Sequence, residues 1–261
     1  MSPWIASIHA HQVPIWLLLQ ITALCAMLTW FFRRTRGEPS GLRLALVLAL
    51  PGAALGALGL GIVLRLPAFV ASGFEPRRLF GMGVMAYGAL GGLVGTYAAV
   101  VRIRGGAVAS ALDRLAPALG LLVLFGRTGC LFAGCDFGRV SGMPWAMRYP
   151  RGTAAFLEHV EQKLIPASAE YTLPVHPAQA YEAALGLLMA GVGLVVERKK
   201  LRPGTVFASV AGTYAAGRFL TDLFRGDSRP MLGPLSMPQW LSITVLACVV
   251  LWATGAPRGE R

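Results

Sequence analysis

The sequence predicts an all-α polytopic membrane protein with about seven transmembrane helices and an ordered loop on the outer face. Of the 261 residues, 55% are hydrophobic and only 14% are charged, a composition too apolar for an ordinary soluble domain. Several apolar runs are about 20 residues long, the length that an α-helix needs to cross roughly 30 Å of hydrocarbon. No soluble domain or repeat is evident, so we expect one membrane domain over residues 1–261.

Seven apolar runs are candidate spans. Polar residues interrupt two of them, with Asp113 and Arg114 in the fourth run and Arg218 and Asp222 in the sixth. Because charge in hydrocarbon is costly, such residues usually line a functional site, so both runs are kept as spans. The first run is long and lacks an A-x-A-like cleavage site, which indicates an anchor rather than a removed signal peptide. The runs cover residues 13–32, 42–64, 79–101, 107–125, 176–196, 204–224 and 235–252.

The distribution of positive charge predicts the orientation of these spans. Cytoplasmic loops carry an excess of lysine and arginine, so we expect the N-terminus outside and the C-terminus in the cytoplasm. The net charge of +12 then reflects membrane topology and does not indicate a nucleic-acid partner. The basic residues follow the first, third and fifth runs and end the chain: Arg33, Arg34, Arg36, Arg102, Arg104, Arg198, Lys199, Lys200, Arg202, Arg258 and Arg261.

The long connection at roughly 127–175 is expected to form an ordered cap on the outer face, since it contains several aromatic residues and prolines. Topology predicts few arginines on that face, so the ones present call for a chemical explanation. An arginine guanidinium matches phosphate oxygens bidentately, which makes anionic lipid head groups the expected partner. These arginines are Arg127, Arg139, Arg148, Arg151 and Arg225.

The segment 126–140, GRTGCLFAGCDFGRV, places two arginines, an aspartate, two cysteines and four glycines at the end of the fourth run. An arginine this close to hydrocarbon is a candidate site residue, and the glycines allow backbone or ligand to approach closely. For Cys130 and Cys135, a disulfide, a reactive thiol and inert packing all remain open. A structural metal needs more ligands than two cysteines and a distant histidine, so we expect no metal and no cofactor.

A second polar cluster, HPAQAYE at residues 176–182, opens the fifth run. Two roles are open for His176, which either caps the helix or makes an interfacial hydrogen bond, or else shuttles protons in a reaction. We expect Glu182 to pair with an arginine of another helix in preference to acting as a base.

A third polar cluster covers residues 214–227 at the end of the sixth run. Tyr214, Arg218, Asp222 and Arg225 recur at intervals of four, four and three residues, so they share one face of a helix. That face is either an ion-pair ladder that satisfies itself or a functional site. Burial in a membrane favours the functional site.

Taken in chain order, these clusters resemble the prolipoprotein diacylglyceryl transferase family. Its members are bacterial inner-membrane enzymes that attach diacylglycerol to the lipobox cysteine of preprolipoproteins. The segments 126–140, 144–150, 176–182, 214–227 and 236–239 each resemble a block of that family in the same order. The resemblance implies seven spans with an outside N-terminus, phosphatidylglycerol as the lipid donor, and a cysteine-containing exported protein as the acceptor.

The resemblance also implies roles for individual residues. Arg127 and Arg218 match arginines that bind and polarise phosphatidylglycerol, and Tyr214 and Asp222 match positions beside the second arginine. Either Asp222, His176 or Tyr87 is expected to handle the proton of the substrate thiol. The remaining residues that match binding positions are Gly138, Arg139, Gln179 and Glu182, and we add Arg225, Cys130 and Cys135 as lipid or substrate contacts.

The chain departs from the family pattern at three positions. Cys130 and Cys135 stand where the family usually has asparagine and glutamate, and Tyr87 stands where it has a histidine. A tyrosine ordinarily titrates near pH 10 and is a poor base at neutral pH. Two other functions therefore stay open: a membrane lipid-binding or partner protein that is catalytically silent, and a transferase with another substrate or with Cys130 or Cys135 as a covalent carrier.

Overall fold

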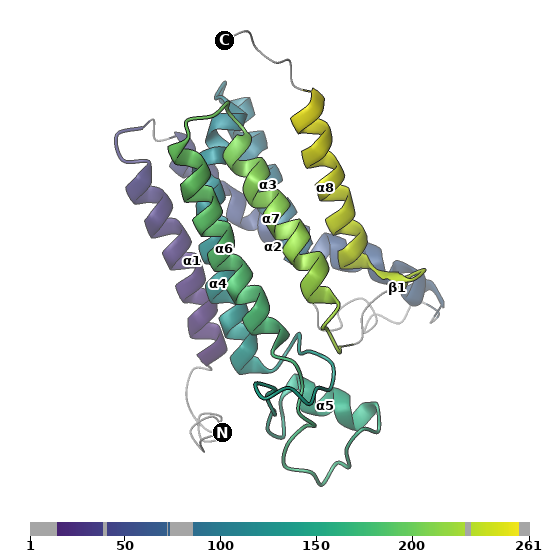
Figure 1. Ribbon diagram of the computed structural model, residues 1–261. Coiled ribbons are helices and arrows are strands. Elements are labelled where there is room, and N and C mark those ends of the chain that lie inside the picture. The colour runs from purple at the N-terminus through teal and green to yellow at the C-terminus, as the bar shows by residue number, and fades with distance from the viewer. Residues whose placement is uncertain (1–14, 39–40, 72, 74–85, 228–230, 256–261) are drawn as a thin grey trace. The chain divides into compact units, whose positions relative to one another are not determined.

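A computed structural model describes residues 15–38, 41–71, 73, 86–227 and 231–255 of the chain. The architecture is mostly helical (Figure 1). The elements in order are α1 (Ile15–Arg34), α2 (Gly41–Ala71), α3 (Ala86–Ile103), α4 (Val108–Ala133), α5 (Ala154–Glu161), α6 (Ala178–Arg198), α7 (Thr205–Asp222), β1 (Met231–Leu232), β2 (Leu235–Ser236) and α8 (Met237–Gly255). The two short strands pair antiparallel, with Met231 opposite Ser236.

Within the described residues, five helices are long and apolar enough to cross a membrane. This confirms the expected class of a polytopic helical membrane protein, whereas the number seven stays a prediction. A sixth apolar stretch in α3 is shorter, and residues 79–85 of its predicted span lie outside the described residues. Helix α7 does not join the five because Arg218, Asp222 and its small polar residues lower its hydropathy. The five spans are Ile15–Arg34, Gly41–Leu64, Val108–Ala133, Ala178–Arg198 and Met237–Thr254.

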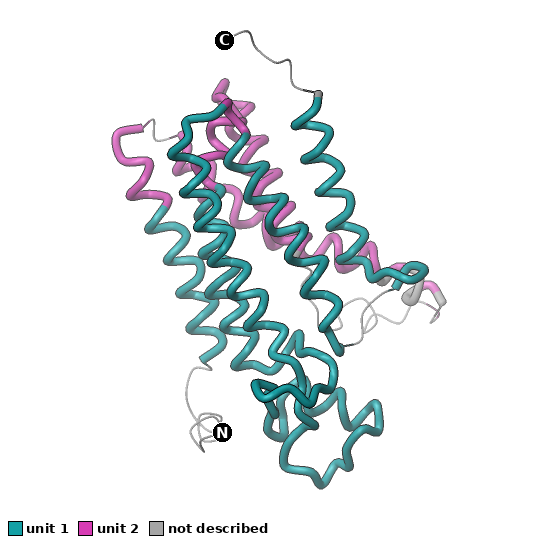
Figure 2. Tube along the Cα trace, viewed as in Figure 1, with its two compact units in different colours: residues 1–30, 116–201, 205–261 teal, residues 31–115, 202–204 magenta. Residues whose placement is uncertain are grey.

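The chain divides into two compact units (Figure 2). Unit 1 comprises the described parts of residues 1–30, 116–201 and 205–261, and unit 2 those of 31–115 and 202–204. The expectation of a single membrane domain over the whole chain stays a prediction.

In unit 2, glycines allow α2 and α3 to pack closely. A Cβ atom added at Gly52 would lie 2.7 Å from the Cβ of Thr96, and one at Gly56 would lie 2.8 Å from the Cα of Gly92. Small residues four apart commonly let membrane helices approach in this way. Nearby, the buried Tyr97 donates a hydrogen bond of 3.3 Å to the carbonyl of Ala111.

In unit 1, glycines also set the distance between α4 and α6. A Cβ atom on Gly120 would lie 2.5 Å from the backbone nitrogen of Ala190, and one on Gly186 would lie 2.5 Å from that of Leu124. On the next helix, a Cβ atom on Gly217 would lie 2.7 Å from a methyl group of Leu185. The polar ends of α4, α6 and α7 are therefore held close together.

Helix α4 extends eight residues beyond its predicted end at 125 and includes Arg127 and Cys130. The segment has no proline, and its one charged residue, Arg127, is paired with carboxylates, so nothing ends the helix before Gly134. Gly134 has φ +70° and its N–H donates to the carbonyl of Cys130 at 3.0 Å. This left-handed glycine is a common way to end a helix.

Residues 134–177 form an ordered segment beyond the end of α4. Phe137, Tyr149, Ala155 and Val175 make its small buried core. Short backbone pairings between residues 140, 147 and 175 and between 150 and 171 hold the segment together. Thr153 caps α5 by accepting a hydrogen bond from the N–H of Phe156 at 3.4 Å. The sequence predicted order in this region, and its place on the outer face stays a prediction.

Candidate functional site

Three arginines from different parts of unit 1 converge on the buried carboxylate of Glu182 in α6. The Nε of Arg127 lies 2.7 Å from Oε2 of Glu182, while the Nη1 atoms of Arg218 and Arg225 lie 3.6 and 3.4 Å from its Oε1. The Glu182 side chain is 1% exposed. Glu182 thus pairs with arginines of other elements, as the sequence analysis expected.

Asp222 supports Arg218 at the end of α7. Its Oδ1 lies 2.9 Å from Nη1 of Arg218, and its Oδ2 accepts a hydrogen bond of 2.5 Å from Ser236, the last residue of β2. Gln239 in turn accepts a hydrogen bond of 3.0 Å from the backbone N–H of Ser236. The Arg218–Asp222 pair of the predicted ladder is present within α7. The prediction that Arg225 shares this helix face is wrong, because α7 ends at Asp222. The Arg225 side chain pairs instead with Glu182, Asp136 and Asp227.

Asp136 joins Arg127 and Arg225 at the more exposed edge of the same cluster. Its Oδ2 lies 2.5 Å from Nη1 of Arg127, and its Oδ1 lies 2.7 Å from Nη2 of Arg225. Burial raises the pKa of the Asp136 carboxyl, but Arg225 and Arg127 outweigh this and hold that pKa well below its usual range. Its side chain remains 32% exposed.

Sequence reasoning did not single out Asp136. The available signal was an acidic residue within the same glycine-rich segment as Arg127, but sequence spacing alone gives no partner for it. Asp227 was missed as a site residue for the same reason, and it lies 2.6 Å from Nη2 of Arg225.

Together these residues form what we call the arginine–carboxylate network: Arg127, Arg218, Arg225, Asp136, Glu182, Asp222 and Asp227. Its three positive and four negative groups give a formal charge of −1. Breaking one partner out of a buried ion pair costs about 3–5 kcal/mol, so the network holds its arginines firmly in place. Chemically, a set of positioned guanidinium groups can bind an anion and stabilise charge that develops on it.

Tyr214 lies on the same face of α7, one turn before Arg218, and is 6% exposed. The structure thus brings it beside the network, in agreement with the helix spacing. Its role in binding stays a prediction.

Backbone hydrogen bonds around Gly138 hold Asp136 and Arg225 in register. The N–H of Gly138 donates to the carbonyl of His176 at 3.0 Å, and that of Arg139 donates to the carbonyl of Phe224 at 2.8 Å. A Cβ atom on Gly138 would lie 2.5 Å from the Cβ of His176, so only glycine fits here. The Arg139 side chain donates to the carbonyl of Leu223 and is exposed. Gly138 and Arg139 therefore position the network, and neither makes one of its ion pairs.

His176 lies beside this junction with its ring half-buried. Its Nδ1 is 3.1 Å from the hydroxyl of Tyr181, which also accepts a hydrogen bond of 2.8 Å from Trp145. The ring packs edge-on against Phe224, with ring centroids 5.2 Å apart. These contacts fit the interfacial hydrogen bond considered from the sequence, and a role in proton transfer stays a prediction.

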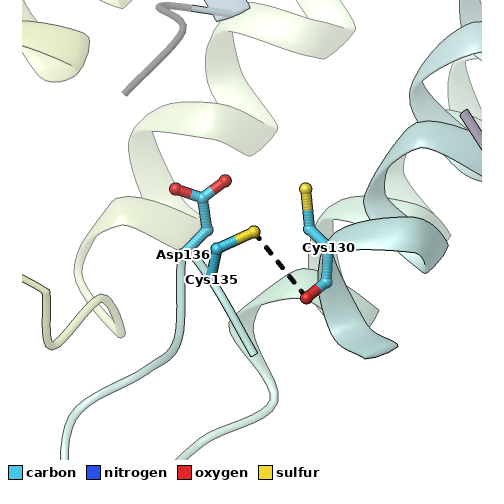
Figure 3. Close-up of side chains that lie close together, drawn as sticks. All are labelled: Cys130, Cys135 and Asp136. Atoms are coloured by element: carbon cyan, nitrogen blue, oxygen red, sulfur yellow. Dashed lines mark hydrogen bonds between the residues drawn. The ribbon is translucent and has the colours of Figure 1, made fainter. Parts of the chain in front are cut away.

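Cys130, Cys135 and Asp136 lie close together at the end of α4 (Figure 3). Their potential metal ligands all lie within 4.8 Å of one another. Both oxygens of Asp136 already bind arginines, whose positive charge disfavours a cation. The carbonyl of Cys135 accepts a hydrogen bond of 2.5 Å from the buried side chain of Gln179. Gln179 therefore anchors the residue that precedes Asp136.

Tyr87, the last candidate, lies half-buried in the first turn of α3 in unit 2. Its proposed part in the reaction stays a prediction.

The fold and the site define a helical membrane protein that keeps a buried network of arginines and carboxylates. The chain belongs to the prolipoprotein diacylglyceryl transferase family, whose model matches residues 3–254. This confirms the family resemblance recognised from the sequence.

Individual members of the family are similar over much of the chain. The chain is 29% identical to the phosphatidylglycerol–prolipoprotein diacylglyceryl transferase of Clostridium tetani, over 65% of the chain and 62% of that relative. It is 30% identical to transferase 2 of Clostridium perfringens, over 65% of the chain and 60% of the relative. For the Rhodococcus jostii transferase the identity is 27%, over 93% of the chain and 70% of the relative. The chain thus spans less than two thirds of the length of the two clostridial relatives.

Proposed function

We propose that this protein transfers a diacylglyceryl group from phosphatidylglycerol to a cysteine thiol of an exported lipoprotein-like substrate. The thiolate sulfur forms a bond to the glyceryl carbon, the bond from that carbon to the phosphate oxygen breaks, and glycerol phosphate leaves. The observation that carries the proposal is the convergence of Arg127, Arg218 and Arg225 on Glu182 in a member of this family.

The arginines suit the leaving group of this reaction. Negative charge accumulates on the phosphate as the carbon–oxygen bond breaks, and positioned guanidinium groups stabilise it. In the resting protein, Asp136 bridges Arg127 and Arg225 from the partly exposed edge of the network. We propose that the lipid phosphate takes the place of the Asp136 carboxylate between these two arginines, since both anions accept the same charge-assisted hydrogen bonds.

Other residues of the site are given supporting roles. The Asp222 carboxylate is buried between Arg218 and Ser236, which suits it to position Arg218 better than to accept a proton.

We propose His176 as the acceptor of the thiol proton, because its half-buried ring lies at the junction that holds Asp136 and Arg225. Tyr87 is the alternative acceptor. Tyr214, Gln179, Cys130 and Cys135 are proposed to shape the lipid site.

We further propose that the protein crosses the bacterial inner membrane seven times. The N-terminus and the 134–177 segment lie outside and the C-terminus lies in the cytoplasm. The basic clusters after the first, third and fifth runs support this orientation. The protein acceptor and the lipid donor then meet on the outer side of the membrane.

The direct test measures transfer of a labelled diacylglyceryl group from phosphatidylglycerol to a lipobox peptide, using purified protein in lipid nanodiscs. We expect Arg127→Ala to abolish transfer while the protein still inserts and purifies. Arg151→Ala is the matched control, because Arg151 is exposed and its described side-chain bonds go to the carbonyl of Ala169. Equal activity of Arg127→Ala and the unmodified protein would contradict the proposal.

A second candidate is the same scaffold acting on another substrate, or binding lipid without turnover. Tyr87, Cys130 and Cys135 favour it, because they replace residue types that the resemblance leads us to expect. Complementation of a strain depleted of its own diacylglyceryl transferase separates the two. Rescue establishes the ordinary reaction, and failure of a well-expressed, membrane-inserted protein favours the second candidate.

A further inference from the structure

A pair of free thiols lies at the C-terminal end of α4. Cys130 is in the last turn of the helix, and Cys135 follows two residues after its end. Figure 3 shows the Cys135 side chain directed toward Cys130, and its sulfur lies 3.9 Å from the carbonyl oxygen of Cys130. The two sulfur atoms lie within 4.8 Å of each other. Both residues are half-buried, so neither is sealed in a core.

The backbone brings these two side chains together. When a helix ends in a left-handed glycine, the residue four before the glycine and the residue just after it commonly touch. Gly134 is that glycine, with φ +70° and its hydrogen bond of 3.0 Å to the carbonyl of Cys130. A Cβ atom on Gly134 would lie 3.0 Å from both Thr153 and Tyr149, so packing also fixes the turn. The pairing of Cys130 with Cys135 is thus set by the end of the helix.

Neither a metal site nor inert packing accounts well for this pair of thiols. A metal ion would recruit Asp136 as its third ligand, but that carboxylate already serves Arg127 and Arg225. Inert packing suits cysteines in an apolar core, whereas these two lie beside charged groups and are partly accessible.

The pKa of Cys135 is raised, because its thiol donates a hydrogen bond to Cys130 and because burial disfavours the thiolate. Cys130 is therefore the better placed of the two to attack first.

We propose that Cys130 and Cys135 form a reversible disulfide that locks the end of α4 and slows the reaction at the neighbouring network. The oxidant is an external disulfide, either a small molecule such as oxidised glutathione or a protein dithiol–disulfide carrier. Cys130, as the thiolate, attacks one sulfur of the oxidant and releases one thiolate. The released thiolate then takes the proton of the Cys135 thiol, and the Cys135 sulfur attacks the Cys130 sulfur and displaces the second thiol. The protein loses two protons and two electrons, and the oxidant gains them.

The geometry requires only a local change. The sulfur atoms must approach from within 4.8 Å to a bond length of about 2 Å, between residues already joined by the turn at Gly134. Cys135 directly precedes Asp136, whose carboxylate holds Arg127 from the same helix. A disulfide would therefore hold Asp136 against Arg127 and hinder its exchange for a lipid phosphate. This effect on the rate rests on the proposed function, whereas formation of the disulfide does not.

The test uses the full-length protein in nanodiscs that contain phosphatidylglycerol. Cys25 and Cys248, the other two cysteines, lie exposed on α1 and α8 and are both replaced by serine. After treatment with oxidised glutathione, we expect mass spectrometry to find one peptide pair linked through Cys130 and Cys135, with two hydrogen atoms lost. Dithiothreitol should reverse the linkage. With Cys135→Ser added, Cys130 should instead stop at the mixed disulfide with glutathione.

The same samples report the effect on activity. We expect oxidation to lower diacylglyceryl transfer at least several-fold and dithiothreitol to restore it. The Cys135→Ser variant cannot form the Cys130–Cys135 linkage, so we expect it to lose the reversible inhibition that this linkage causes. Two thiols that remain separately alkylatable after oxidation would overturn the disulfide, and a full linkage with unchanged transfer would overturn the lock. If the reduced protein transfers nothing, the proposed function fails, while the mass measurement still decides the disulfide.

Discussion

Glu182 is the buried carboxylate on which three arginines of the network converge. Three arginines lie within 3.6 Å of its carboxylate, and no more than 1% of its side chain is exposed. A buried carboxylate among cations has a structural use, because it compensates charge that otherwise faces an apolar interior. It also fixes where the guanidinium groups point, which a phosphate ligand requires. Glu182 therefore stabilises the network and, under the proposed function, also orients the arginines toward the lipid phosphate.

Replacement of Glu182 tests this dependence. Glu182→Gln keeps the size of the side chain but removes its charge, which leaves the arginines partly uncompensated. We expect a loss of roughly 3–5 kcal/mol, the usual cost of breaking a buried pair, seen as a lower midpoint of thermal unfolding in detergent. Glu158→Gln on α5 is the matched control, since Glu158 accepts an exposed hydrogen bond from Gln162. Equal midpoints for the two variants would contradict the role of Glu182.

Asp136 makes a prediction about pH. Its pKa in the folded protein lies below the value of about 3.9 that an unfolded chain has. The unfolded state therefore binds the proton more readily, and the stabilisation by Asp136 is present above about pH 4 and lost as the pH falls through the folded pKa. We expect the difference in unfolding midpoint between the unmodified protein and Asp136→Asn to be constant near neutral pH and to shrink in acid. A difference that grows on acidification would count against this assignment.

Asp136 also makes a prediction about binding. If the lipid phosphate exchanges with its carboxylate, Asp136→Asn removes a competing anion and should lower the KM for phosphatidylglycerol several-fold. If Asp136 has only a structural role, the variant should instead show a lower kcat and no decrease in KM. Steady-state transfer at varied phosphatidylglycerol content in nanodiscs distinguishes these outcomes.

At the level of helices, close packing of α4 against α6 brings the network together. Gly120 and Gly186 let the two backbones approach, and Arg127 and Glu182 follow and precede these glycines by seven and four residues. Each polar residue lies about one or two turns from the tight contact, so its position is determined by the packing. Gly120 and Gly186 lie outside the Arg127–Glu182 ion pair, but they allow the close helix packing that brings its two side chains together.

A methyl group at this contact should damage the site. Gly186→Ala places a Cβ atom 2.5 Å from the backbone nitrogen of Leu124, so the helices must separate. We expect loss of transfer activity and a lower unfolding midpoint, with overpacking typically costing about 1–3 kcal/mol. Gly191→Ala on the same helix is the control, because a Cβ atom there meets nothing within 4 Å. Similar behaviour of the two variants would mean that the close contact is not needed.

Hydropathy located the long apolar helices, and the polar motifs named most residues of the network. Helical spacing correctly placed Tyr214, Arg218 and Asp222 on one face of α7, but it wrongly added Arg225, which follows the end of that helix. The sequence did not predict that α4 continues to Ala133. The free-energy cost of placing the charged Arg127 within an apolar helix is offset by Glu182, a partner that is distant in sequence. For the same reason the sequence missed Asp136, whose partners come from α4 and from the residues after α7. Contacts between distant segments depend on packing that local patterns do not contain.

At the level of the whole molecule, the orientation in the membrane decides where the site operates. The proposed outer location of the 134–177 segment would place the network where an exported protein can present its cysteine. The basic residues after α6, including Lys199 and Lys200, would then lie in the cytoplasm. The proposed reaction at the network and the positive charge of the loops thus both favour the same orientation, with the network on the outer side of the membrane.

Cysteine labelling in intact cells tests that orientation. In a chain whose four cysteines are replaced by serine, a single cysteine is introduced at Glu161 in the 134–177 segment or at Lys199 after α6. We expect a membrane-impermeant maleimide to label Glu161→Cys in intact spheroplasts, and to label Lys199→Cys only after the membrane is permeabilised. Both positions are exposed, so a failure to label cannot result from burial. The opposite pattern would place the arginine–carboxylate network toward the cytoplasm, where an exported cysteine does not reach it, and the proposed acceptor would have to be given up.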